Sequence, residues 1–266
     1  MSEITEALRE IISPNFNFSS NHLEILAAKC TPDNIDEVDS RMERSLLSWA
    51  AYGGAVTAVN KLLENGANVN LRDKRGGTPI IHAVHSGIAG IIMALVEAGC
   101  NVNHVDDFGM RALDYAIKLG GRYEVINVLL GAGANVDHAM PDTYTYLMSA
   151  VSNNDSRLVQ LLLDHKADPN QGLHFKHTPL TLAVRAGKWT EIVCALLAAG
   201  ADVNKPGKYG RTPLFYAVAN NYPEMQLLTQ LLERGADVNK SDNGGVTPLR
   251  LGREGNAGIL LRSFAK

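Results

Sequence analysis

Histidine and cysteine are the residue types of this chain best suited to chemistry, so their spacing matters first. The 266 residues include eight histidines and three cysteines. His104 and His138 lie 34 residues apart, and His174 and His177 are close neighbours. A zinc site needs about four ligands within roughly 2.0–2.3 Å of one ion. No pair of cysteines lies near either histidine pair to complete such a set, so we expect no metal and no cofactor.

The cysteines are Cys30, Cys100 and Cys194, an odd number at wide spacing. This pattern disfavours disulfides and favours a reducing compartment. Each cysteine falls where a core or cap residue is expected, which disfavours a nucleophilic Cys–His pair without excluding it. The chain has neither a Gly-x-x-x-x-Gly-Lys-Ser/Thr loop nor a Gly-x-Ser-x-Gly elbow. We therefore predict that it is not an enzyme.

Composition and charge narrow the class of protein further. The chain is 45% hydrophobic and 20% charged, which is typical of a packed protein. Its net charge of −3 disfavours nucleic acid as a partner. Residues 1–41 hold eight acidic and three basic residues, so the rest of the chain is slightly basic. No secretory signal and no apolar run long enough for a membrane span is visible. We expect a cytoplasmic protein that does not bind membranes.

A six-residue pattern recurs along the chain and indicates repeated structural elements. It begins with Thr-Pro at Thr78, Thr178 and Thr212, and a shorter form begins at Thr247. A second pattern, close to Gly-Ala-x-Val-Asn, ends at an Asn or Asp. The intervals between these positions are 33, 34, 33, 34 and 35 residues, for positions 70, 103, 137, 170, 204 and 239.

This period and these two motifs resemble the ankyrin repeat family. The resemblance implies an all-α solenoid whose units each contain two helices and a short β-hairpin finger, with caps at both ends. One unit cannot bury its own apolar face, so stability has to come from stacking on its neighbours. We divide the chain into an N-terminal helical cap and repeats: 1–40, 41–73, 74–106, 107–140, 141–173, 174–207, 208–242 and a truncated C-terminal cap at 243–266.

The second repeat shows the physical basis of the pattern. Thr78 is placed to cap a first helix, and Pro79 follows where a missing N–H costs nothing. Gly87 can end that helix in a left-handed conformation. The third repeat has Arg111-Ala112 in place of Thr-Pro. Two explanations for such departures remain open, namely neutral drift and a functional demand for particular side chains.

The front of the chain follows the repeat pattern less closely. Residues 22–28 are interpreted as a degenerate first helix, and residues 35–42 as a short second helix of the cap.

The resemblance also implies where a partner would bind. In ankyrin proteins the partner lies along the concave side, against finger tips and the exposed ends of first helices. Aromatic and Arg side chains dominate interface hot spots, and the chain places several at these positions. Alternatively, each aromatic ring folds back over its own finger. The candidate residues are Phe108, Met110, Lys118, Tyr144, His174, Phe175, His177, Arg185, Lys208, Tyr209 and Arg211.

These features predict a monomeric protein-binding module that acts as a non-catalytic adaptor or scaffold. The basic residues near the tips predict a partner whose binding surface has an acidic border. The alternative is an inhibitor that occludes a partner enzyme or toxin, as an immunity protein or an effector does. A chain of repeats without an appended domain favours that alternative.

Overall fold

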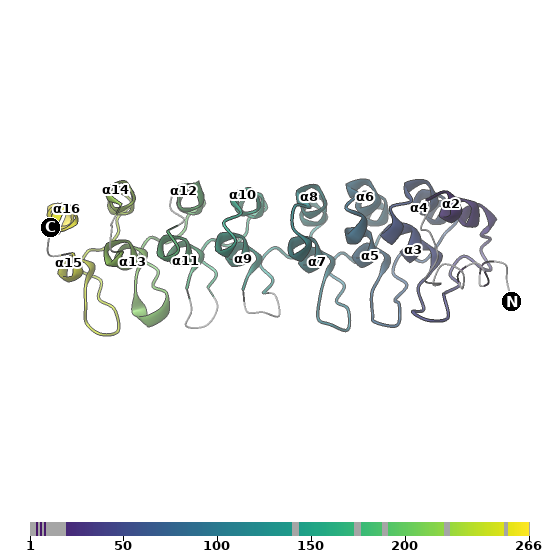
Figure 1. Cartoon of the computed structure of the whole chain (residues 1–266), viewed down its shortest axis with the longest axis horizontal. Coiled ribbons are helices and arrows are strands. Elements are labelled where there is room, and N and C mark those ends of the chain that lie inside the picture. Colours follow the sequence, from purple (N-terminus) through teal and green to yellow (C-terminus); the bar gives the residue numbers. More distant parts are fainter. Residues whose placement is uncertain are drawn as a thin grey trace. The chain divides into compact units, whose positions relative to one another are not determined.

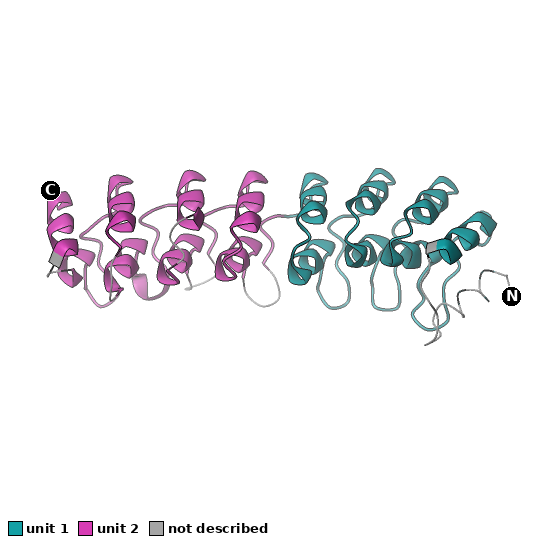
Figure 2. Cartoon of the chain, turned by 45° about the horizontal axis from the view of Figure 1, so that its top comes forward, with its two compact units in different colours: residues 1–135 teal, residues 136–266 magenta. Residues whose placement is uncertain are grey.

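The computed structural model describes residues 4, 6, 8, 20–139, 144–172, 177–187, 191–220, 224–252 and 255–265. The chain forms two compact units, residues 1–135 and residues 136–266 (Figure 2). Each unit is an all-α stack of helix pairs, which confirms the predicted fold class. Within each unit the first helices of the repeats form one layer and the second helices form another (Figure 1).

Between Ser20 and Gly131, the described residues of the first unit form three complete helix pairs preceded by one further helix. The first helices α3, α5 and α7 pack on one another in order, and so do the second helices α4, α6 and α8. The bounds are α2 Ser20–Lys29, α3 Leu46–Gly53, α4 Val56–Glu64, α5 Pro79–Ser86, α6 Ala89–Glu97, α7 Ala112–Leu119 and α8 Tyr123–Gly131.

The second unit repeats this arrangement through four helix pairs, the last of which has a first helix of one turn. The bounds are α9 Tyr146–Ser152, α10 Ser156–Asp164, α11 Pro179–Arg185, α12 Glu191–Ala198, α13 Pro213–Ala219, α14 Met225–Glu233, α15 Pro248–Leu251 and α16 Gly255–Phe264. A short 3₁₀ helix, η1 Lys208–Gly210, lies before α13.

Polar side chains start most of the first helices as the sequence predicts. The hydroxyls of Thr178, Thr212 and Thr247 accept backbone N–H bonds at the starts of α11, α13 and α15. Thr78 occupies the same position before α5, but its side chain accepts no such bond. The prediction that Thr78 caps this helix through its side chain is therefore wrong. At α7 the carboxylate of Asp114 accepts a bond of 2.6 Å from the N–H of Arg111. Asp114 therefore compensates for the missing Thr.

The periodic Asn residues join each repeat to the next within a unit. Asn204 shows the pattern: its Oδ1 accepts from the N–H of Asp237, and its Nδ2 donates to the carbonyl of Gly235, both at 2.8 Å. Asn70, Asn103 and Asn170 make equivalent pairs of bonds. Each amide thus satisfies one donor and one acceptor of the following repeat.

Each finger loop of the first unit is shaped by a buried carboxylate. Asp73 accepts two finger N–H groups on Oδ1, at 2.9 Å from Arg75 and 2.8 Å from Gly77. A side chain of the following helix binds Oδ2, here His82 at 2.9 Å. Trp49 and Tyr115 occupy the same helix position in their own repeats and donate to Asp39 and Asp106 in the same way.

The fingers are loops rather than β-hairpins with assigned strands in the described part of the chain, which holds only isolated bridges. In the described residues, neighbouring fingers share a single backbone hydrogen bond, such as that from Asp107 N–H to the Arg75 carbonyl at 3.0 Å. One bond per neighbour is too few to build a ladder. The Asp side chains supply the other contacts that shape the loop.

The structure corrects the expected arrangement of residues 20–45. Helix α2 packs against α4, a second helix, so residues 22–28 form a second helix rather than a first one. Residues 35–42 are turns and a bridge, not a helix. Asp39 is the reason, because its carboxylate accepts the N–H groups of Arg41, Met42 and Arg44 and folds this segment as a finger.

The apolar core of each unit lies between its two helix layers. Leu62, Leu95 and Leu129 are fully buried in the first unit, and Leu162, Leu196 and Leu231 are fully buried in the second. Within the described part of the chain, no helix has the length and apolar character needed to cross a membrane.

We predict that Leu231→Ala lowers the free energy of unfolding by about 2–5 kcal/mol, because it leaves a cavity between helix pairs. Urea denaturation followed by circular dichroism measures the change. Ile259→Ala is the matched control, since Ile259 is 63% exposed. An equal effect of the two substitutions would contradict the described packing.

The pKa of Asp73 yields a second prediction. Burial alone raises this pKa, but hydrogen bonds from His82, Arg44 and two finger N–H groups outweigh burial and hold it well below its usual range. The unfolded value is about 3.9. Since the folded pKa is the lower one, the carboxylate stabilises the fold above about pH 4, and this contribution is lost as pH falls through the folded pKa.

Asp73→Asn should therefore lower the free energy of unfolding at pH 7 by about 1.5–3 kcal/mol and flatten its decline below about pH 4. Denaturation curves between pH 2.5 and 7 measure both effects. The control is Asp107→Asn, because Asp107 pairs with Arg72 at the exposed surface and such pairs contribute about 0–1 kcal/mol. Matching pH profiles for the two variants would refute the role given to Asp73.

Candidate functional site

The structure separates the candidate residues into exposed and buried groups. Phe108 is 60% exposed, Tyr209 is 56% exposed and Tyr144 is 37% exposed, and each lies in or beside a finger loop. Met110 and His177 are buried, at 5% and 9% exposure, so we remove both from the contact set. The Met110 side chain points to its own repeat, where its sulfur contacts Lys118 Nζ at 3.7 Å.

The basic candidates lie on exposed first-helix ends and on one finger. Lys118 and Arg185 are exposed at the ends of α7 and α11, and Lys208 is exposed on the finger before α13. Arg211 is half-buried, and its Nε donates to Asp242 at 3.2 Å. His174 and Phe175 lie outside the described residues.

In the second unit, Tyr209 lies at the centre of a basic and aromatic finger. Lys208 Nζ lies 4.7 Å from its ring centroid and the Arg211 guanidinium lies 5.6 Å away. The bond from Lys208 and the positive charges lower the pKa of the Tyr209 hydroxyl. The Tyr209 backbone is left-handed, with φ of 64°. That conformation costs a residue with a Cβ roughly 1–2 kcal/mol.

The finger that carries Tyr209 has lost the usual carboxylate. Gly207 stands at the position of Asp73, and a Cβ there would come within 2.8 Å of Thr181 Oγ1. The Tyr216 hydroxyl, at the position of His82, donates instead to the Lys208 carbonyl at 3.1 Å. His177 packs edge-on against the Tyr216 ring, with the centroids 5.4 Å apart. This finger is thus supported by aromatic packing.

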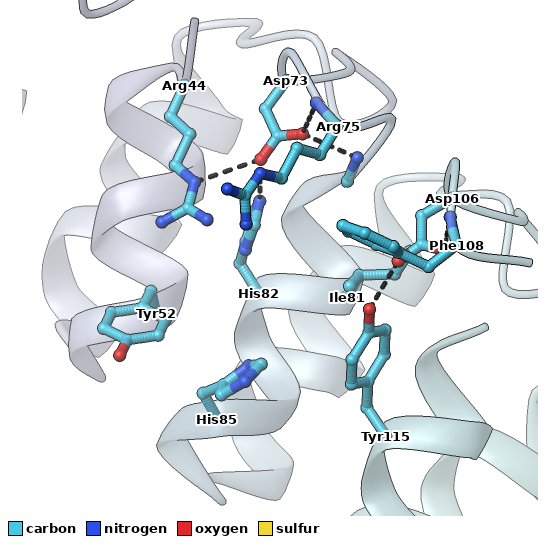
Figure 3. A pocket seen from close by; sticks show the side chains of 11 residues that line it. Arg44, Tyr52, Asp73, Arg75, Ile81, His82, His85, Asp106, Phe108 and Tyr115 are labelled. Atoms are coloured by element: carbon cyan, nitrogen blue, oxygen red, sulfur yellow. Dashed lines mark hydrogen bonds and ion pairs between the residues drawn. The ribbon is translucent and has the colours of Figure 1, made fainter. Parts of the chain in front are cut away.

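The first unit contains a cleft of about 290 Å³ between its fingers and first helices. The cleft is open to solvent, and polar and aromatic side chains from three repeats line it (Figure 3). Its lining residues are Arg44, Tyr52, Asp73, Arg75, Gly77, Ile81, His82, His85, Asp106, Phe108 and Tyr115. We call it the unit 1 cleft.

One end of the unit 1 cleft is organised around Asp73. Arg44 Nε donates to Asp73 at 3.1 Å from the preceding finger, while His82 Nε2 donates at 2.9 Å from below (Figure 3). Burial lowers the pKa of His82 despite this carboxylate, which favours the neutral ring at pH 7. At the next repeat the Tyr115 hydroxyl donates to Asp106 at 2.6 Å. Burial and that bond raise the pKa of Tyr115, so it stays a donor.

A series of aromatic rings crosses the first helices below these groups. Trp49 and Tyr52 have centroids 6.2 Å apart, Tyr52 and His85 are 5.3 Å apart, and His85 and Tyr115 are 5.9 Å apart. Phe108 adds a further ring at the finger, where the Arg75 guanidinium lies 5.8 Å from its centroid. The cleft therefore offers flat apolar surface beside guanidinium groups.

The possible metal ligands and thiols of the described residues are the next groups to consider. Among them no three His, Cys, Asp or Glu side chains gather where they could hold a metal ion. Burial raises the pKa of the Cys30 and Cys100 thiols to about 11, so neither is a reactive thiolate at neutral pH. Cys194 is exposed, contrary to the expectation that every cysteine lies in a core or cap position.

Of the residues that line the unit 1 cleft, the sequence analysis proposed Phe108 as a contact residue. It missed Arg44, Asp73, Asp106 and Tyr115. A usable signal was present, because Trp49, His82 and Tyr115 recur at an interval of 33 residues with an acid preceding each by nine or ten.

Comparisons with known proteins agree with this architecture. The family described as "Ankyrin repeats (3 copies)" matches residues 47–140 and 147–251. The chain is 30% identical over 234 residues to the ankyrin repeat protein nuc-2 of Neurospora crassa, covering 84% of this chain and 22% of nuc-2. It is 35% identical over 182 residues to Rabankyrin-5 of Homo sapiens, covering 66% of this chain and 15% of that protein. The chain thus spans less than a quarter of either relative.

A solved structure shows the same fold. The ankyrin repeat domain of Bcl-3, a member of the IkappaB protein family, superimposes with a TM-score of 0.69 at 26% identity. The alignment covers 81% of this chain and 97% of that domain. The matched family spans most of the chain and the helix pairs repeat as the motifs predict. The chain therefore belongs to the ankyrin repeat family, whose repeats serve as protein–protein interaction modules.

Proposed function

We propose that this chain is a non-catalytic adaptor or scaffold that binds a partner protein through its finger tips and the exposed ends of its first helices. The observation that carries the proposal is the exposure of three aromatic rings, Phe108, Tyr144 and Tyr209, on the finger side of the two units. Large exposed aromatic side chains cost solubility and are typical of interface hot spots.

The surroundings of these rings support a partner with an acidic border. Lys118, Arg185 and Lys208 are exposed nearby, and Arg75 and Lys208 lie against the rings of Phe108 and Tyr209. Cationic side chains on aromatic surface are frequent in interfaces. His174 and Phe175 stay in the proposed set on the basis of sequence alone.

The left-handed backbone of Tyr209 is a further support. A glycine would adopt φ of 64° without the cost that a side chain incurs. Backbone strain concentrates at functional positions, because the surrounding structure has to maintain it. Among the described finger residues of its unit, the strained Tyr209 is also the most exposed aromatic. The three free cysteines support a reducing, cytoplasmic location for this function.

The proposal is tested by a pull-down that compares the wild type with a Phe108→Ala, Tyr144→Ala, Tyr209→Ala variant. Bound proteins from source-cell lysate are identified by mass spectrometry, and circular dichroism checks that both baits fold. Each truncation should weaken binding of a verified partner by about 1–4 kcal/mol. If both baits retain the partner equally, the binding site does not lie at the finger tips.

A sharper test separates stability from binding at Tyr209. Tyr209→Gly relieves the left-handed strain, so the free energy of unfolding should stay constant or rise by up to about 1 kcal/mol. Partner affinity should fall at the same time, because the ring is lost. Thermal melting and titration of the verified partner measure the two quantities. A clear loss of stability would show that the ring serves local packing instead.

A further inference from the structure

We propose that the unit 1 cleft binds an acidic peptide segment of a partner, with one Asp or Glu carboxylate held between the guanidinium groups of Arg44 and Arg75. The inference deepens the proposed function, on which it rests, by naming the chemistry of the bound segment. Three observations support it: the lining residues offer N–H donors, aromatic rings lie beside those donors, and both face one open cleft.

The two carboxylates that line the cleft, Asp73 and Asp106, have most of their acceptor sites used within the protein. The Asp73 carboxylate accepts four bonds, two from finger N–H groups, one from Arg44 and one from His82. The Asp106 carboxylate accepts three, from Phe108 N–H, Met110 N–H and the Tyr115 hydroxyl. A carboxylate has about four acceptor sites. These two acids therefore offer little to a ligand that donates hydrogen bonds.

The guanidinium groups of Arg44 and Arg75 keep N–H donors that pair with no carboxylate of the described residues. The Arg75 guanidinium lies over the Phe108 ring, and no carboxylate of the described residues pairs with it. Arg44 uses Nε for Asp73, and its terminal nitrogens lie on the side of the guanidinium away from Asp73 (Figure 3). The two positive charges of Arg44 and Arg75 balance the two negative charges of Asp73 and Asp106. The cleft therefore has more N–H donors than acceptors available to a ligand, but no net charge from these four residues. Planar guanidinium groups match the two oxygens of a carboxylate.

The aromatic series selects a peptide over an isolated anion. The ring of Tyr52 is 40% exposed, and its centroid lies 5.3 Å from the His85 ring, next to the Arg44 end of the cleft. A residue adjoining the bound Asp or Glu would cover these rings. A volume of about 290 Å³ accommodates one acidic side chain and part of its neighbour. The segment we infer pairs an acidic residue with an aromatic or other apolar one.

The experiment is a selection of random 12-residue peptides, displayed on phage, against the complete chain. Enriched peptides should share an Asp or Glu beside an aromatic or apolar residue. The strongest binder is then synthesised in three forms: as selected, with the acid replaced by its amide, and with phosphoserine in its place. Fluorescence anisotropy should show at least a roughly tenfold loss of affinity for the amide form.

Two matched variants locate the binding. Arg75→Ala removes free donors from the cleft, and we expect roughly tenfold weaker binding of the selected peptide. Arg72→Ala removes the same charge from the same finger, but Arg72 lies outside the cleft lining and pairs with Asp107 at 3.0 Å. It should change affinity by less than about twofold. Arg75→Lys keeps the charge without the planar fork and should lie between them.

Several outcomes would overturn the assignment. The first is a selection that yields no acidic consensus, and the second is a peptide that binds Arg75→Ala and Arg72→Ala equally well. The third is tighter binding of the phosphoserine form than of the acidic form, which would assign the cleft to phosphorylated segments. Each is compatible with loss of a verified partner on truncating the exposed aromatic rings. Failure of this inference is therefore distinguishable from failure of the proposed function.

Discussion

A buried carboxylate at the root of a finger is the interaction on which the face of the first unit depends. One oxygen of Asp73 fixes the turn of the finger by accepting two of its N–H groups, and the other ties the finger to the following helix. Asp39 and Asp106 do the same in the neighbouring repeats. Because the loops lack extended ladders, these side chains determine where the exposed tips lie. The tips can then vary in sequence without loss of the loop conformation.

The same carboxylates explain how an interaction surface coexists with a stable stack. The helix residue that binds Asp differs from repeat to repeat, as Trp49, His82 and Tyr115, but each supplies one donor at one place. The side chain at this helix position thus always donates a hydrogen bond, while its size and aromatic character differ between repeats. The Tyr115 ring also lines the unit 1 cleft. A structural requirement and the proposed binding surface therefore share this residue.

The repeats were predictable from sequence because their signals are local and periodic. Thr-Pro marks helix starts, and Asn at intervals of 33–35 residues marks joints between repeats. The arrangement of residues 20–45 was not predictable, because Asp36 replaces Asn in bonding to the N–H of Asn68, and Asp39 folds a segment without Thr-Pro. The burial of Met110 and His177 could not be predicted from the sequence either. A finger position is fixed by spacing, but whether its side chain turns inward depends on neighbours from other repeats.

The second unit shows what happens when the carboxylate is absent. Gly207 leaves its finger without an Asp, and the loop adopts a 3₁₀ turn with Tyr209 in a left-handed conformation. Lys208 and Arg211 pack against the Tyr209 ring, and Arg211 is anchored in turn by Asp242 of the next finger. This finger lacks the carboxylate that accepts backbone N–H bonds in the first unit, and it presents an exposed aromatic ring flanked by cations. Because a glycine at position 209 would adopt the left-handed backbone at lower cost, we link the tyrosine found there to the proposed contact with a partner.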